Sequence, residues 1–128
     1  MELEIGMKGS ASNLVERADT AYEVGSGSLL VYATPCMVAL MEGAACNAIA
    51  PSLSNEKTSV GVALDVSHIA ATPIGMEVRA EAELTAIENN TLTFSIAAYD
   101  ESGKIGQGTH KRVIVTTQKF LDRTYGKL

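Results

Sequence analysis

Residues 34–51 read TPCMVALMEGAACNAIAP, and this stretch decides which kind of fold the chain can adopt. Thr34-Pro35 is a strong helix start, because Pro is favoured in the first helical turn and Thr is a good N-cap for the free N–H groups. Pro51 is expected to stop the helix. Since the helix is apolar on nearly every face, we expect it to be buried rather than to lie on the surface.

The sequence after this helix alternates between apolar and polar residues, as β-strands do. The first strand is expected to place five side chains on one face: Val60, Val62, Leu64, Val66 and His68. Short turns at residues 89–90 and 101–104 join the last three strands into an antiparallel meander. An early strand is expected within residues 3–15, and residues 118–128 form a polar tail or a short helix.

One apolar helix beside an antiparallel sheet is an α+β layout. The length of 128 residues suits one domain, so we treat residues 1–128 as a single domain. One helix covering one sheet leaves strand edges open and part of the helix uncovered. Because pairing with a second copy would cover both, we expect a homodimer.

Composition and patterning narrow the partners and the location. The formal charge is −5 and there is no Lys/Arg block, which argues against nucleic acid. The longest uncharged run, Val24–Met41, contains Gly and Pro and makes a poor membrane span, and no secretory signal is visible. Cys36 and Cys46 lie roughly 15 Å apart along the expected helix, too far to form a disulfide. Free thiols favour the cytoplasm.

Glu42 is the only charged residue in the thirty residues from Ser26 to Asn55. A carboxylate with apolar helical neighbours lies at an interface or is desolvated, which makes Glu42 a candidate general base. The alternative is a buried Glu that bonds to the backbone or to a partner subunit.

Three other polar residues are candidates for chemistry, each with an ordinary alternative. Thr34 serves as an N-cap, yet that position also favours developing negative charge. His68 ends the apolar face of a strand, and His110 alternates with Arg112; either can be a purely structural histidine. No metal site is expected, because the two His and two Cys lack zinc-like spacing.

Taken in order, Thr34-Pro35, Glu42 and His68 resemble the fluoroacetyl-CoA thioesterase-like family of hot-dog-fold acyl-CoA thioesterases. The segments HIAATPIGMEV at 68–78 and GTHKR at 108–112 are similar to that family's strand-turn-strand and closing-strand motifs. The resemblance covers about residues 8–118, and the ordered set is more specific than any one motif.

The resemblance implies a hot-dog fold, in which an antiparallel sheet wraps a long central helix and continues across a dimer. It implies Thr34, Glu42 and His68 as the catalytic set, with Gly61 and Arg112 binding the substrate. No cofactor is expected, because CoA is part of the substrate. The implied assembly is a homodimer, and a dimer of dimers is a further option.

The implied reaction is hydrolysis of an acyl-CoA thioester. Glu42 would act as base or nucleophile, and Thr34 would help to polarise the carbonyl. His68 would assist proton transfer or stabilise the leaving thiolate. Thr34 and Glu42 lie about 12 Å apart along the helix axis, so a direct hydrogen bond between them is not expected. Either the thioester lies between them, or the helix begins later, or the set is completed across subunits.

One departure from the family bears on specificity. Its fluoroacetyl-specific members carry an aromatic lid just before the Thr, where this chain has Gly25 and Ser28. We therefore expect a small acyl group other than fluoroacetyl. Lys104, Lys111 and Arg112 are candidates to bind the phosphates of CoA. A non-catalytic acyl-CoA-binding module, a hydroxyacyl-thioester dehydratase and a purely structural dimer stay open as alternatives.

Overall fold

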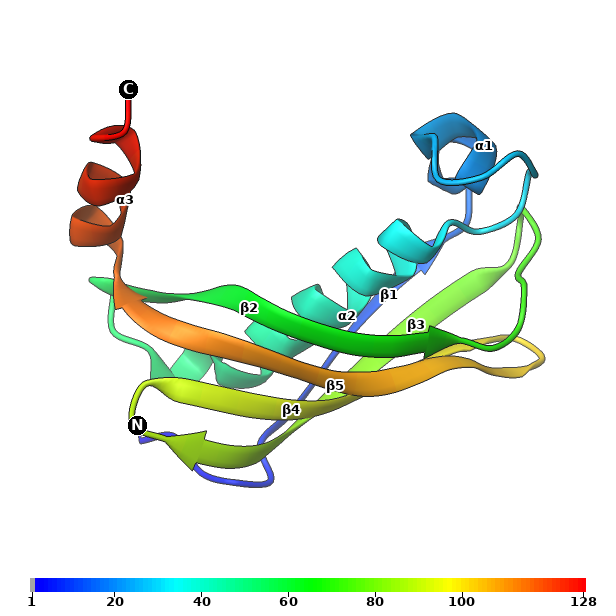
Figure 1. The fold of residues 1–128 in the computed structure, drawn as a ribbon. Coiled ribbons are helices and arrows are strands. Elements are labelled where there is room, and N and C mark those ends of the chain that lie inside the picture. Colours follow the sequence, from blue (N-terminus) through cyan, green and yellow to red (C-terminus); the bar gives the residue numbers. More distant parts are fainter. Residues whose placement is uncertain (1) are drawn as a thin grey trace.

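The computed structural model describes residues 2–128, which form one sheet and three helices (Figure 1). The strands are β1 (Lys8–Leu14), β2 (Lys57–His68), β3 (Glu77–Glu88), β4 (Thr91–Asp100) and β5 (Gly103–Thr116). The helices are α1 (Ala21–Val24), α2 (Thr34–Ile49) and α3 (Thr117–Tyr125), and short 3₁₀ turns lie at Arg17–Asp19 and Ala50–Ser52. No helix among residues 2–128 is long and apolar enough to cross a membrane.

The five strands form one antiparallel sheet in the order β1-β3-β4-β5-β2. This order confirms the predicted meander of the last three strands and puts β1 and β2 at the two edges. Figure 1 shows α2 lying along the sheet, with α1 and α3 at opposite ends. The α+β class is confirmed, and the tail adopts the helical one of its two predicted states.

One face of α2 packs closely against the sheet, chiefly against β1 and β3. Six of its side chains are buried there: Met37, Met41, Ala44, Ala45, Ala48 and Ile49. The approach is closest at Gly9 of β1, where a Cβ would overlap the backbone nitrogen of Ala48 and the backbone oxygen of Ala44. The helix backbone therefore rests directly on β1, and only glycine fits at this position.

The expected N-cap of α2 is wrong, whereas the exposed side of the helix agrees with the expectation that one chain leaves part of it uncovered. Thr34, Pro35, Ala39 and Asn47 are exposed, because no other element of residues 2–128 covers the side of the helix that faces away from the sheet. The N-cap is Ala33, whose backbone is extended, and Thr34 is the first helical residue. The Thr34 hydroxyl does not cap the helix, because it bonds to His68 instead.

The expectation that five alternating residues of β2 share one face is also wrong. The register against β5 shifts between Gly61 and Ala63, because a β-bulge places an extra residue in the strand. Gly61 pairs with Arg112 before the bulge, and Leu64 pairs with His110 after it. Leu64, Val66 and His68 therefore share a face with Gly61 and not with Val60.

The contact between Gly9 and α2 yields a stability prediction. Gly9→Ala should lower the free energy of unfolding by about 1–3 kcal/mol, because the helix has to move away from the strand. Gly43→Ala is the matched control, since its Cβ would lie 3.9 Å from the Cβ of Ala11 and helical Ala is preferred over Gly. Urea denaturation measures both. Equal midpoints for Gly9→Ala and the wild type would contradict the packing described.

Candidate active site

Two polar clusters lie between α2 and the β2–β5 side of the sheet, and the first joins Thr34 to His68. Thr34 begins α2 and His68 ends β2, so the strand end meets the helix start. The Thr34 Oγ1 lies 2.7 Å from the His68 Nδ1, a hydrogen-bond distance. The structure thus brings together two of the three predicted catalytic residues.

His68 is half-buried, and burial lowers its pKa below the usual 6.5, so the ring is neutral near pH 7. Its ring meets that of Tyr32 edge-to-face at 6.5 Å between centroids. Burial also raises the pKa of the Tyr32 phenol, which therefore stays protonated. Among residues 2–128, the Tyr32 hydroxyl and the His68 Nε2 are buried without a hydrogen-bond partner. Both residues border a cavity of about 320 Å³ that also includes Thr34.

The second cluster surrounds the Glu42 carboxylate. The Arg112 Nη1 lies 3.6 Å from the Glu42 Oε2, and the Glu42 side chain is 37% exposed. Gly61 faces this carboxylate: a Cβ there would lie 2.7 Å from the Glu42 Oε2. The missing side chain at Gly61 therefore leaves room for Glu42. Three predicted site residues, Glu42, Gly61 and Arg112, thus lie side by side.

Arg112 is buried, with an exposed fraction of 6%, and its guanidinium donates within the chain. The Nε donates to the Ser59 Oγ at 2.8 Å and the Nη2 to the Ser59 carbonyl at 3.0 Å. The Nη1 lies 3.1 Å from the His110 Nε2. A buried charge needs such partners. This geometry favours a role in orienting Glu42 over a direct bond to the phosphates of CoA.

The chain alone does not bring the three predicted catalytic residues into one contact. Thr34 and Glu42 are eight residues apart on α2, about 12 Å along the axis, and each belongs to a different cluster. Sequence reasoning also missed Ser59, Tyr32 and the role of His110 beside Arg112. The alternation of His110 with Arg112 was the available signal for the last of these. No group of three or more His, Cys, Asp or Glu residues within 2–128 is arranged to hold a metal.

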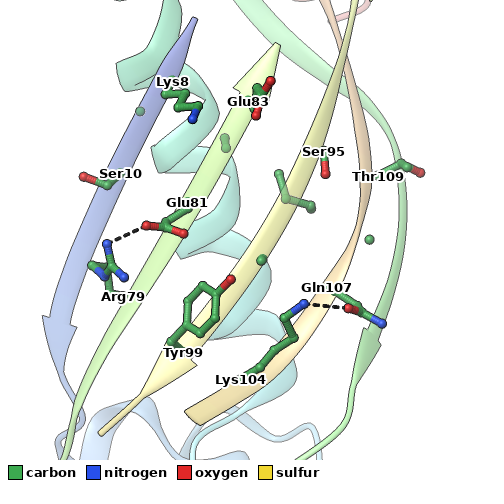
Figure 2. Close-up of a pocket in the computed structure, with 15 residues that line it drawn as sticks. Lys8, Ser10, Arg79, Glu81, Glu83, Ser95, Tyr99, Lys104, Gln107 and Thr109 are labelled. Atoms are coloured by element: carbon green, nitrogen blue, oxygen red, sulfur yellow. Dashed lines mark hydrogen bonds and ion pairs between the residues drawn. The ribbon is translucent and has the colours of Figure 1, made fainter. Parts of the chain in front are cut away.

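A larger hollow, about 780 Å³, lies on the opposite face of the sheet (Figure 2). Three of its charged side chains already have partners: Arg79 pairs with Glu81, and Lys104 bonds to Gln107 at 3.0 Å. Figure 2 places Lys104 on this outer face, with α2 behind the sheet. None of the predicted catalytic residues borders this hollow, so its size does not make it the candidate active site.

Comparison with known proteins supports the family resemblance at the level of sequence. A family model described as the fluoroacetyl-CoA-specific thioesterase FlK matches residues 15–118. The curated fluoroacetyl-CoA thioesterase of Streptantibioticus cattleyicolor is 43% identical over 90 residues. That match spans 70% of this chain and 65% of the relative, just under two thirds of its length.

Solved structures extend the likeness to the whole fold. The fluoroacetyl-CoA thioesterase FlK superposes with a TM-score of 0.93 at 32% identity, over 100% of this chain and 99% of that one. A thioesterase superfamily member from Thermus thermophilus gives 0.87 at 30% identity, over 97% and 93% of the two chains. A hot-dog-like protein from Thermanaerovibrio acidaminovorans, 24% identical, gives 0.88 over 98% and 93%, which bears on the fold alone. The chain therefore has the hot-dog fold and belongs to the family of fluoroacetyl-CoA-specific thioesterases.

Proposed function

We propose that this chain is an acyl-CoA thioesterase that hydrolyses a small acyl-CoA to the free acid and CoA. The observation that carries the proposal is the Glu42 carboxylate, which Arg112 orients over Gly61 on the flank of α2 that faces β2 and β5. The Thr34–His68 hydrogen bond supplies a second reactive pair, where the end of β2 meets the start of the same helix. Family membership supports the same reaction class.

In the proposed reaction, water adds its oxygen to the thioester carbon, the C–S bond breaks, and the CoA thiolate takes a proton. Glu42 either removes the proton from water or attacks the carbon itself, forming an anhydride that water then opens. His68, neutral near pH 7, moves the proton toward the leaving sulfur. Thr34, with the first N–H groups of α2 or the Gly61 backbone, stabilises the oxyanion.

We also propose that the active site is completed in a homodimer. The β2 edge is open and carries exposed Val62 and Leu64, and this apolar edge suits strand pairing with a second copy. Antiparallel pairing about a two-fold axis near Asp65 would place His68 of one protomer opposite Gly61 of the partner subunit. The two clusters would then face each other across the interface. A dimer of dimers is compatible with this arrangement.

The acyl group is proposed to be small and other than fluoroacetyl. The positions that carry an aromatic lid in fluoroacetyl-specific relatives are Gly25 and Ser28, and both are exposed. Neither residue brings an apolar ring over the cavity at Thr34 and His68. We further propose a cytoplasmic location, supported by the free thiols of Cys36 and Cys46.

Release of free thiol from a panel of acyl-CoAs tests the reaction. Glu42→Gln should lower kcat by about 10²–10⁴-fold, because the amide is neither a base nor a nucleophile. Glu83→Gln, the same change on the outer face of β3, should leave kcat unchanged. Undiminished hydrolysis by Glu42→Gln would remove Glu42 from its role. Binding without turnover would favour a binding module, an enoyl product would favour a dehydratase, and preference for fluoroacetyl-CoA would contradict the proposed specificity.

The lowered pKa of His68 predicts how activity depends on pH. Its neutral form accepts the proton, so kcat/KM should rise with pH through a midpoint below 6.5 and then level off. His68→Gln should lower kcat/KM. The fall of kcat/KM at acid pH that comes from protonation of His68 should be absent in this variant. A pH–rate profile of the wild type and the variant measures both. An acid midpoint above 6.5 that shifts with His68→Gln would contradict the assignment.

Mixing two inactive variants tests which subunit supplies each residue. Heterodimers of His68→Asn and Glu42→Gln should contain one fully intact site if the site is composite. Statistical mixing makes half of the dimers heterodimers, so about a quarter of wild-type activity should return. If each site is contained within one chain, the mixture should regain no activity. Sedimentation of the mixture checks that dimers form.

A further inference from the structure

We propose that His110 is a positioning residue, whose single fixed tautomer holds the Arg112 guanidinium that orients Glu42. This inference rests on the proposed function, because it assigns His110 a part in the same site. It also goes beyond that function, since the mechanism above does not use His110. The argument depends on the two ring nitrogens of His110 and on what each one bonds.

The partners of His110 fix where its proton lies. The Nη1 of Arg112 is 3.1 Å from the His110 Nε2. Because a guanidinium donates and does not accept, the Nε2 has to be the acceptor and carries no proton. The ring proton is therefore on the Nδ1, which donates to the Ala63 carbonyl at 2.9 Å. His110 is thus neutral, and both nitrogens are used.

The surroundings keep the ring in this state. His110 is 1% exposed, and the Phe94 ring of β4 lies 6.2 Å away between centroids. Burial is the main cause that lowers the pKa of His110, and the nearby Arg112 charge acts in the same direction. Glu42 of α2 and the Ala63 carbonyl of β2 act against it. The ring therefore stays neutral near pH 7.

All three guanidinium nitrogens of Arg112 have partners, and His110 holds the one nearest to Glu42. Ser59 accepts from the Nε and the Nη2, whereas the Nη1 lies between the His110 Nε2 and the Glu42 Oε2. A Cβ at Gly61 would meet the Glu42 Oε2 at 2.7 Å and the His110 Cε1 at 3.2 Å. His110 and Glu42 therefore flank the same glycine, and His110 sets the direction of the shared nitrogen.

A purely structural role is the competing explanation. Ala63 follows the bulge in β2, so the bond from the His110 Nδ1 also fixes the bulged strand. The two roles use opposite nitrogens and can be separated by substitution. Gln at position 110 places its amide oxygen near the Nε2 position, where it accepts from Arg112. Asn places its amide N–H near the Nδ1 position, where it donates to Ala63.

Kinetics of the full chain with a substrate from the acyl-CoA panel compares His110→Gln with His110→Asn. Positioning through Arg112 predicts that Asn lowers kcat by about 10–100-fold with little change in KM, as the loss of an orienting partner does. His110→Gln should lower kcat markedly less, although this variant lacks the hydrogen bond to the Ala63 carbonyl. Equal kcat in the two variants, or losses that follow the melting temperatures, would overturn the proposal.

A second readout does not require turnover. The chain has two histidines, so ¹⁵N NMR of the imidazoles resolves His110, and His110→Gln assigns it. We expect a neutral ring with a protonated Nδ1 and an unprotonated Nε2 at pH 7. A protonated Nε2 would overturn the proposal. If the wild type hydrolyses no thioester, the proposed function fails, and the tautomer still decides whether Arg112 is held by His110.

Discussion

A single sixteen-residue helix has to cover one face of a five-stranded sheet. The candidate active site lies where close packing of the helix against the sheet ends. Small residues bring the α2 backbone directly onto β1, with Gly9 beneath Ala44 and Ala48. This close contact gives a dense core on the β1–β3 side. It leaves Thr34 and Glu42 on the flank of the helix that faces β2 and β5, where the Glu42 side chain is 37% exposed.

The β-bulge in β2 determines which residues of this strand face α2. Gly61 and His68 are seven positions apart, so a regular strand would send them to opposite faces of the sheet. The register shift between Gly61 and Ala63 puts both on the face that looks toward α2. One extra residue therefore lets the same strand provide space for Glu42 and a hydrogen bond for Thr34. Bulges are often found next to active sites for this reason.

The sequence predicted features that depend on local patterns and missed those that depend on contacts across the fold. Pro35 and the alternation after residue 76 are local, so the helix and the meander could be read directly. The bulge has no such signal, since Gly61 fits a regular strand equally well. The apolar helix was expected to be buried, but periodicity does not say whether the sheet or a second copy covers each face. The contact between Glu42 and Arg112 joins residues seventy positions apart. Only the resemblance to known enzymes named both as site residues.

The position of Arg112 accounts for a carboxylate at position 42, within a thirty-residue stretch without other charges. A guanidinium that is 6% exposed needs an anion nearby as well as neutral acceptors, and Glu42 is the carboxylate that the structure places beside it. At 3.6 Å the pair is an ionic contact rather than a short hydrogen bond, because Ser59 and His110 take the directed bonds. The carboxylate oxygens therefore stay available for water or substrate. A buried arginine whose N–H groups donate to other acceptors can thus orient a carboxylate and leave its oxygens free to react.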